Sequence, residues 1–375
     1  MVNSTGHSNL DVFFELLRAG LWETDARLRP YESISFKEVY KIAKDQSVIG
    51  LITAGLEHVA DMEVSDPDSL SFVYGALSLE QRNIAMNRFI CDLMVKFEKE
   101  GIEALLVKGQ GIAQCYERPL WRASGDVDLL LDKKNYDRAK VVLGAIADRH
   151  GEELLDRFHI DFTIGKWEVE LHGSMRNGLW KRMNMAIDAA QASAFCSYKD
   201  RIWLNGGVAV ALPSVDDDVI FVFTHILQHF FNGGIGLRQI CDWCRLLYKY
   251  RNDIDLDLLR TRLRYYRLFS EWKAFAALAV YWLGMDKSII PFYSTARCWR
   301  KKSDKIIALI LEDGNFGQNR DDSYYQKYPF FIIKVISLWR FTWDSMRYCL
   351  IFPVDALKVW VSKFSRGVKS VAKGQ

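Results

Sequence analysis

Residues 104–131 read ALLVKGQGIAQCYERPLWRASGDVDLLL, with two short apolar runs on either side of a polar segment. The first run, 104–107, is continuous and apolar, which is typical of a buried strand. The turn 108–111 (KGQG) follows it and leads into a short helical stretch, and 126–131 (DVDLLL) is a second candidate strand. Strands that alternate with helical segments in this way predict an α/β core.

The segments that follow extend this core. Apolar residues recur at helical spacing between 135 and 147, and 159–164 and 167–172 are two further candidate strands. The resulting order of helices and strands assigns residues 101–212 to one α/β unit.

Helical periodicity dominates on both sides of this unit. Gly101 ends a long amphipathic pattern, and Ser214, followed by three aspartates, is typical of a helix start. The predicted organisation is therefore an N-terminal helical region, 1–100, the core, 101–212, and a C-terminal helical region with a basic tail, 213–375.

Composition limits the class of protein. The chain has 375 residues, and 50% of them are hydrophobic and 26% charged, which excludes a disordered, collagen-like or disulfide-scaffold protein. The formal net charge of +3 gives no electrostatic reason to expect a nucleic-acid partner. Seven scattered cysteines favour a reducing compartment, and no secretory signal is visible. The apolar stretch 328–353 is interrupted by charged residues, so it is not a candidate transmembrane helix. We therefore expect a cytoplasmic protein without a transmembrane helix.

Two aspartates lie two residues apart in the second candidate strand. Asp126 and Asp128 project from the same face of an extended chain, about 6.5 Å apart along it. Two carboxylates on one face of a buried strand repel each other and lose hydration, and a divalent cation is the usual compensation. Taken alone, such a pair is more often a structural feature of an exposed strand edge than a metal site.

The candidate strand 167–172 (WEVELH) alternates strictly, with Glu168, Glu170 and His172 on one face. A neighbouring position in the sheet would bring Glu170 beside the aspartate pair and supply the third carboxylate of a two-metal site. Glu168 is the alternative third carboxylate. A half-exposed strand with a polar outer face explains the same alternation equally well.

The turn Lys108-Gly-Gln-Gly111 stands where a strand leads into a helix. Glycines at such a turn let a phosphate approach the backbone amides, and a helix N-terminus favours anions. The spacing matches neither a Walker loop nor a dinucleotide fingerprint, so the turn on its own indicates an ordinary glycine turn.

Together these motifs resemble the DNA polymerase β-type nucleotidyltransferase superfamily, and specifically the bacterial family described as uncharacterised nucleotidyltransferases, often associated with polysaccharide biosynthesis. The resemblance spans about residues 100–320. The chain departs from the wider superfamily at two points, since most of its members carry Gly-Ser at the phosphate turn and the third acid is usually an aspartate. The resemblance rests on Lys108, Gly109, Arg122, Asp126, Asp128, Glu170 and His172, and on the later stretches His225…His229, 236–242 (GLRQICD) and 312–317 (EDGNFG).

This resemblance implies an α+β protein, with a nucleotidyltransferase-fold mixed sheet core flanked by N-terminal and C-terminal helical regions. It implies transfer of a nucleoside monophosphate from a nucleoside triphosphate, expected to be ATP, to an unidentified hydroxyl acceptor, with two Mg²⁺ ions. The implied catalytic and metal-binding residues are Asp126, Asp128 and Glu170. The implied nucleotide-binding residues are Lys108, Gly109, Gln110, Gly111, Arg122 and His172.

Some alternatives stay open. Arg122 is as well suited to a structural contact that holds its loop against the core as it is to nucleotide binding. A non-catalytic nucleotide-binding or scaffold protein of a polysaccharide cluster would leave the carboxylates splayed or paired with lysines. Arg238 and Asp242 form a helix-surface pair by spacing, and the resemblance allows them to line an acceptor pocket instead.

Two further patterns point to weaker hypotheses. His225 and His229 have the spacing of a zinc pair on a helix, and a zinc hydrolase would need a third ligand that the sequence does not reveal. Cys241 and Cys244 have a redox-like spacing, but they lie inside a predicted amphipathic helix, so we interpret them as structural.

The tail 356–375 is basic, and no acid follows Asp355. A basic amphipathic helix with a tryptophan predicts peripheral contact with the inner face of a membrane. A terminal helix docked on its own protein is the alternative. The apolar face is formed by Leu357, Trp360, Val361, Phe364, Val368 and Val371.

Overall fold

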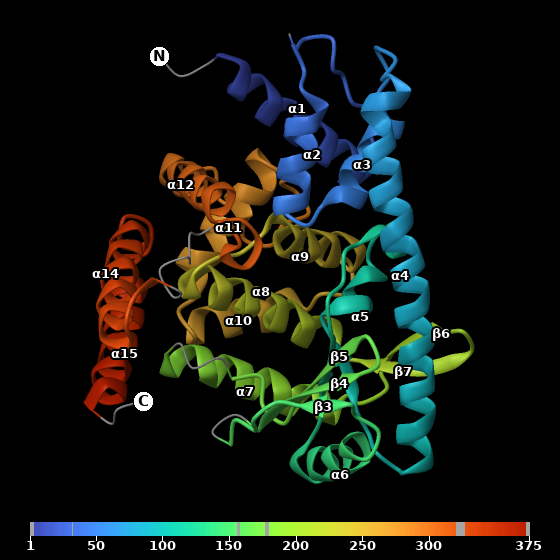
Figure 1. The fold of residues 1–375 in the computed structure, drawn as a ribbon, viewed down its shortest axis with the longest axis vertical. Coiled ribbons are helices and arrows are strands. Elements are labelled where there is room, and N and C mark those ends of the chain that lie inside the picture. Colours follow the sequence, from blue (N-terminus) through green and yellow to red (C-terminus); the bar gives the residue numbers. More distant parts are fainter. Residues whose placement is uncertain (1–3, 32, 156–157, 177–179, 320–326, 373–375) are drawn as a thin grey trace.

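The computed structural model describes residues 4–372, apart from 32, 156–157, 177–179 and 320–326 (Figure 1). The first hundred residues are helical, as predicted. Gly101 follows the last of these helices with φ of +60°, the left-handed conformation that commonly ends a helix. The helices are α1 (Ser4–Trp22), α2 (Phe36–Asp45), α3 (Ile49–Glu57) and α4 (Asp66–Lys99).

A mixed five-stranded sheet follows, in the order β1-β2-β5-β4-β3. The pair β2–β5 is parallel, whereas β1–β2, β5–β4 and β4–β3 are antiparallel. This mixed sheet among helices confirms the predicted α+β class. The elements are β1 (Leu105–Val107), α5 (Gly109–Ala113), η1 (Pro119–Trp121), β2 (Val127–Leu130), α6 (Lys133–Gly144), β3 (Arg149–His150), β4 (His159–Ile164) and β5 (Trp167–His172).

The rest of the chain is mainly helical. Ser214 caps α8, because its hydroxyl accepts a hydrogen bond from the backbone N–H of Asp217. The elements are α7 (Lys181–Cys196), β6 (Arg201–Asn205), β7 (Val208–Leu212), α8 (Val215–Asn232), α9 (Leu237–Lys249), α10 (Leu256–Tyr265), α11 (Phe269–Tyr281), α12 (Arg297–Asp313), η2 (Asn315–Gly317), α14 (Phe330–Cys349) and α15 (Pro353–Ala372). None of the described helices has the length and apolar character needed to cross a membrane.

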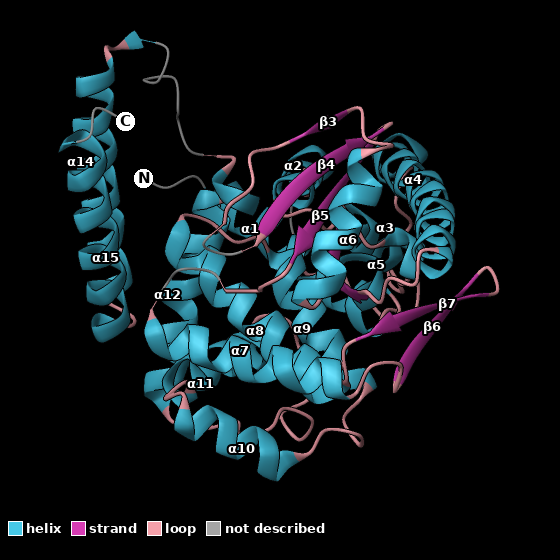
Figure 2. Cartoon of the chain, turned by 90° about the horizontal axis from the view of Figure 1, so that it is seen from below, coloured by secondary structure: helices cyan, strands magenta, loops and turns pink. Residues whose placement is uncertain are grey.

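The two helical flanks share one hydrophobic core. The rings of Phe14 and Trp282 lie 5.1 Å apart, and Arg245 of α9 donates to the carbonyl of Leu21. Helix α4 extends past the N-terminal helices and along the sheet (Figures 1 and 2). Its Ile90 and Phe97 are buried in a second hydrophobic core, which lies between α4, α6 and the sheet. The sheet is therefore held between α4 and α6 on one side and the shared helical layer on the other. The boundaries at 100 and 212 stay a prediction.

A buried cluster of three charges joins distant helices of this layer. Arg182 of α7 contacts Glu271 of α11 at 2.8 Å and Asp355 of α15 at 2.6 Å. Burial, and after it the neighbouring Asp355, raises the pKa of Glu271 to about 8, from an ordinary value of 4.5. The Glu271 carboxyl therefore binds its proton more tightly in the folded protein than in the unfolded chain. The resulting stabilisation is complete below about pH 4.5 and is lost as the pH rises through 8.

Glu271→Gln is expected to make the protein more stable at pH 8.5 and to change little at pH 5. We expect a gain in the free energy of unfolding of at least about 1 kcal/mol at pH 8.5, since one pKa unit corresponds to about 1.4 kcal/mol. Urea denaturation at both pH values measures it, with Glu312→Gln on the surface as the control. A difference of the same size at both pH values would contradict the assignment.

Candidate active site

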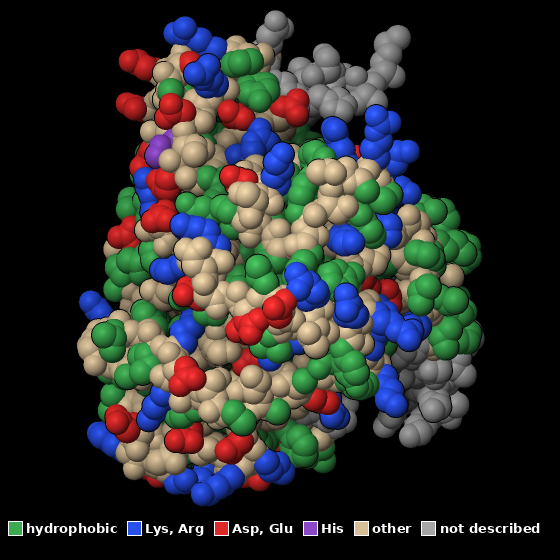
Figure 3. Space-filling view, turned by 180° about the vertical axis from the view of Figure 1, so that it is seen from behind, with side chains coloured by type: hydrophobic (Ala, Val, Ile, Leu, Met, Phe, Trp, Pro, Cys, Tyr) green, Lys and Arg blue, Asp and Glu red, His purple; other side chains and the backbone are tan. Residues whose placement is uncertain are grey.

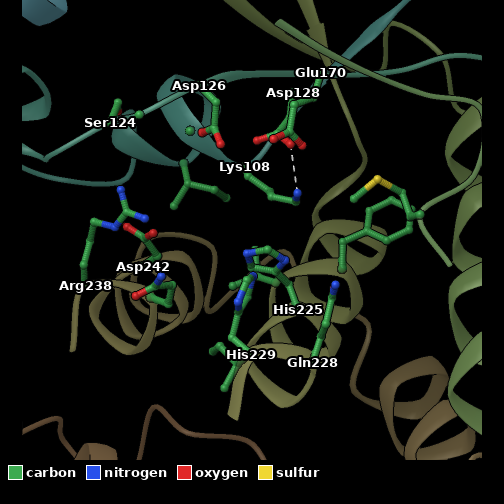
Figure 4. A pocket seen from close by; sticks show the side chains of 18 of the residues that line it. Lys108, Ser124, Asp126, Asp128, Glu170, His225, Gln228, His229, Arg238 and Asp242 are labelled. Carbon is green, nitrogen blue, oxygen red and sulfur yellow. Dashed lines mark hydrogen bonds and ion pairs between the residues drawn. The ribbon is translucent and has the colours of Figure 1, made fainter. Parts of the chain in front are cut away.

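A cavity of about 590 Å³ lies between the sheet and helices α8 and α9 (Figure 4). Carboxylates and Lys108 form one wall, at the β1–α5 turn and on β2 and β5. The facing wall carries His225, Gln228 and His229 from α8 and Arg238 from α9. Acidic groups therefore face a wall of imidazole, amide and guanidinium groups across one space.

The sheet register brings the three predicted carboxylates together. Because β2 and β5 are parallel, Asp128 lies directly opposite Glu170, and Asp126 stands one residue before β2 at the same cavity. Repulsion from Asp128, together with burial and the charge of Glu170, raises the pKa of Asp126 to about 6. The wall therefore holds more negative charge than its own cations neutralise. Glu168, the alternative third acid, is exposed and accepts hydrogen bonds from Thr163 instead.

Two histidines hold these carboxylates in place. His172 Nε2 lies 2.9 Å from Asp128 Oδ1 and 3.2 Å from Glu170 Oε2, and His159 Nε2 lies 3.4 Å from the same Glu170 oxygen. Burial would lower the pKa of His172, but hydrogen bonds to the two carboxylates outweigh it and raise that pKa. Burial would raise the pKa of Glu170, but the two histidines hold it well below its ordinary value. His172 therefore orients two carboxylates and also lines the cavity, and its contact with a nucleotide stays a prediction.

The lysine–glycine turn is strained and aimed at the same wall. Lys108 has φ of +57°, a conformation that side-chain-bearing residues rarely adopt, and Gly109 has φ of +36°. The Lys108 Nζ lies 2.9 Å from Asp128 Oδ1. Burial would lower the pKa of Lys108, but the charges of Asp128 and Glu170 raise it, so the ammonium stays charged. The turn thus presents one cation at the carboxylate wall.

Arg122 is tied to the helical layer. Its Nε and Nη2 donate to the two carboxylate oxygens of Asp242 at 3.0 and 2.6 Å, and its Nη1 donates to Ser124. Tyr116 also donates to Asp242, at 2.7 Å. Arg238 donates to the carbonyl of Ala123, so it too holds this loop. Asp242, which spacing paired with Arg238, thus forms a buried ion pair with Arg122, which lies 120 residues earlier in the sequence.

The facing wall is neutral at its histidines. Burial, and then the charge of Lys108, lowers the pKa of His225 well below its ordinary range and that of His229 to about 4. The two rings lie 4.3 Å apart and turn toward the carboxylates (Figure 4). In the part of the chain that the structure describes, they belong to no group of three metal ligands, so the zinc-hydrolase hypothesis gains no support.

A family model described as uncharacterised nucleotidyltransferase matches residues 32–284. The chain belongs to this family. The match runs from before α2 to just past α11 and includes every residue of the cavity wall described above. No curated protein and no solved structure matches the chain. Membership in this nucleotidyltransferase family supports a general nucleotidyl-transfer activity and a nucleoside triphosphate substrate.

The carboxylates of the cavity have the chemistry of ligands for a divalent metal. Carboxylate oxygens are the ligands that Mg²⁺ prefers, and the unrelieved repulsion between Asp126 and Asp128 is what a bound cation would remove. The residues present therefore fit Mg²⁺. A second possible ligand group lies beside them: His159, Glu170 and His172 each offer an atom within 4.8 Å of the others.

Not every predicted residue of the nucleotidyltransferase turn reaches the cavity. Gln110 is buried and donates to Asn83 and Ser124, and Gly111 packs against Leu212, so neither lines the cavity wall. A part in nucleotide binding for Gln110 and Gly111, through their backbone amides, stays a prediction. Cys241 and Cys244 are buried in α9, and burial raises the pKa of both thiols, as expected of structural cysteines.

Sequence reasoning missed His159 and the residues at the rim of the cavity. A signal for His159 existed, because a two-residue turn at 165–166 pairs 159 with 172 across the hairpin. Arg82 of α4 and Arg176 also line the cavity, and Arg82 donates to the carbonyl of Gly125. Nothing in the local sequence distinguishes these arginines from surface ones.

Proposed function

We propose that this protein is a Mg²⁺-dependent nucleotidyltransferase that moves a nucleoside monophosphate from a nucleoside triphosphate to a hydroxyl acceptor. The observation that carries the proposal is the convergence of Asp126, Asp128 and Glu170 on one cavity wall. These carboxylates would hold two Mg²⁺ ions. When bound, such ions neutralise charge on the α-phosphate and lower the pKa of the acceptor hydroxyl.

The chain's own residues supply binding and orientation. Lys108 would provide a partly buried cation for the triphosphate, and Arg82 adds a second positive charge in the cavity lining, whereas Arg176 is paired with Asp188. His172 fixes the relative orientation of Asp128 and Glu170 through one ring nitrogen. Asp128 and His172 are buried, and the lower dielectric there strengthens the interaction between their charges.

The acceptor hydroxyl would lie toward α8 and α9. A neutral imidazole offers a ring nitrogen that accepts a hydrogen bond from a hydroxyl, and His225 and His229 are both held neutral. Arg238 and Asp242 line the same cavity, which supports the acceptor pocket that the resemblance allows. ATP as donor, a cytoplasmic location and a role in surface polysaccharide biosynthesis remain predictions from the resemblance.

One observation favours a non-catalytic member of the family. Asp128 is paired with Lys108 at 2.9 Å, which is the arrangement that a nucleotide-binding scaffold would keep. The same lysine also stands where a triphosphate would need it, so the pair is compatible with both functions. Metal-dependent nucleotide binding and turnover distinguish them.

The third carboxylate provides the sharpest test. Glu170→Gln is expected to weaken Mg²⁺-dependent binding of a nucleoside triphosphate at least about tenfold, about 1.4 kcal/mol, because a charged ligand of the metal is lost. The matched control is Glu168→Gln, on the same strand but outside the cavity, which should bind as the parent does.

Isothermal titration with each nucleoside triphosphate, with and without Mg²⁺, measures this affinity and also reveals the base preference. Binding that ignores Mg²⁺, or that falls equally in both variants, would contradict the metal site. Mg²⁺-dependent binding without any transfer of label to a hydroxyl compound would support the scaffold instead.

A further inference from the structure

Helices α14 and α15 form a hairpin at one edge of the molecule (Figures 1 and 2). Its inner side is firmly docked. The rings of Tyr348 and Phe352 pack against Phe230 and Phe231 of α8 at 5.0 and 6.0 Å, and Asp355 pairs with Arg182. The orientation of the hairpin on the body is therefore fixed by buried contacts.

The outer side of the hairpin is apolar and exposed. On each helix the exposed apolar residues recur every three or four positions, so they form one continuous stripe. Trp339 and Trp343, one turn apart at its centre, are 69% and 60% exposed. Figure 3 shows hydrophobic side chains gathered along this edge. The stripe consists of Ile332, Val335, Trp339, Trp343, Met346 and Leu350 on α14 and Val354, Leu357, Val361 and Phe364 on α15.

Basic residues accompany the stripe. The segment 330–372 contains seven lysines and arginines and only two acids. One of those acids, Asp355, is buried in its ion pair with Arg182, and Arg347 pairs with Glu312 of α12, so the segment itself keeps a positive net charge. A contiguous apolar surface of this size marks an interaction site, and its tryptophans and positive charge match the headgroup region of an anionic bilayer.

We propose that the α14–α15 hairpin binds the surface of an anionic lipid bilayer, with this stripe in the interface. A second copy of the chain fits less well, because two such hairpins would bring their positive charges together. The surface differs from the one predicted for the tail 356–375. The exposed face lies mainly on α14, Trp360 turns inward and donates to Thr342, and 373–375 lie outside the described residues.

The docked geometry has a consequence for the cavity. Helix α8 contacts the hairpin through Phe230 and Phe231 and lines the cavity through His225 and His229. A bilayer bound at the stripe would therefore hold the cavity at a fixed distance from the lipid surface. The proposal does not depend on catalytic activity.

Vesicle co-sedimentation of the full chain tests it. We expect binding to vesicles of phosphatidylglycerol and phosphatidylcholine, weaker binding at high salt, and little binding to phosphatidylcholine alone. Trp339→Ser/Trp343→Ser should lower the partition coefficient at least about tenfold, about 1.4 kcal/mol. Leu70→Ser/Tyr74→Ser is the matched control, because these α4 residues are also one turn apart and 68% and 73% exposed.

Two results would overturn the proposal. The first is absence of binding to the anionic vesicles, or binding that the tryptophan variant leaves unchanged. The second is a dimer, detected by light scattering, that the tryptophan variant dissociates, since a second copy would then cover the stripe. Brominated lipids add a direct readout: they should quench fluorescence from Trp339 and Trp343 in the parent, and the quenching should fall in the variant.

Discussion

Asp126→Asn is expected to reduce nucleotidyl transfer by at least about a thousandfold, about 4 kcal/mol of transition-state stabilisation, without destabilising the fold. Asp126 stands beside Asp128 and faces the cavity. In the part of the chain that the structure describes, no hydrogen bond to its carboxylate is found. We therefore expect its charge to serve metal binding and not folding.

The stability of the same variant should rise. Repulsion from Asp128 is the largest influence on the Asp126 carboxyl and raises its pKa to about 6. Removing the charge relieves that repulsion, and a gain on the order of 1 kcal/mol at pH 8 is expected. Incorporation of labelled nucleotide and urea denaturation measure the two effects on one preparation.

Asp128→Asn is the matched comparison. Asp128 pairs with Lys108 and His172, so its replacement leaves buried cations without their partner. That variant should lose both activity and stability. An Asp126→Asn protein that keeps its activity, or that unfolds as easily as the Asp128 variant, would contradict the role proposed for Asp126.

The residues of the carboxylate wall could be predicted from the sequence because strand alternation and turn length are local properties of the chain. The alternation in 167–172 predicts which residues share a face, and the two-residue turn fixes the pairing of β4 with β5. The choice of Glu170 over Glu168 needed one further fact, the parallel register of β2 with β5. That register is set by packing of the whole sheet and has no local signature.

The facing wall depends on contacts between distant segments. Periodicity placed His225 and His229 on one helix face, but it could not say which part of the protein that face meets. Arg122 shows the same limit, because its partner Asp242 lies 120 residues later, and spacing had paired Asp242 with Arg238. Helix α7 and the hairpin β6–β7 were not foreseen, since their patterns are short and weakly periodic.

Asp242→Asn is expected to lower the free energy of unfolding by about 3–5 kcal/mol, the range for breaking a buried ion pair by removing one partner. Both Arg122 and Asp242 are almost fully buried, and two hydrogen bonds join them. Asparagine keeps an oxygen that can accept the hydrogen bond from the Tyr116 hydroxyl. The decrease in the free energy of unfolding therefore reports the loss of the carboxylate charge and not the loss of that hydrogen bond. Urea denaturation measures it.

A surface pair and a double variant test the cause. Asp137→Asn breaks the exposed pair with Lys133 and should change the free energy of unfolding by less than about 1 kcal/mol. Arg122→Met/Asp242→Leu removes both buried charges and should recover part of the stability lost by Asp242→Asn. A double variant less stable than either single one would contradict the pairing.

The same variants decide what Arg122 does. If it pins the loop 122–126 to α9, Arg122→Met should lower the free energy of unfolding by a similar amount to Asp242→Asn. Titration of the folded variant should then still show Mg²⁺-dependent nucleotide binding close to that of the parent. A nucleotide contact predicts instead a loss of affinity in Arg122→Met that Asp242→Asn does not share, because the asparagine variant retains the guanidinium. The three donors already used toward Asp242 and Ser124 favour the first outcome.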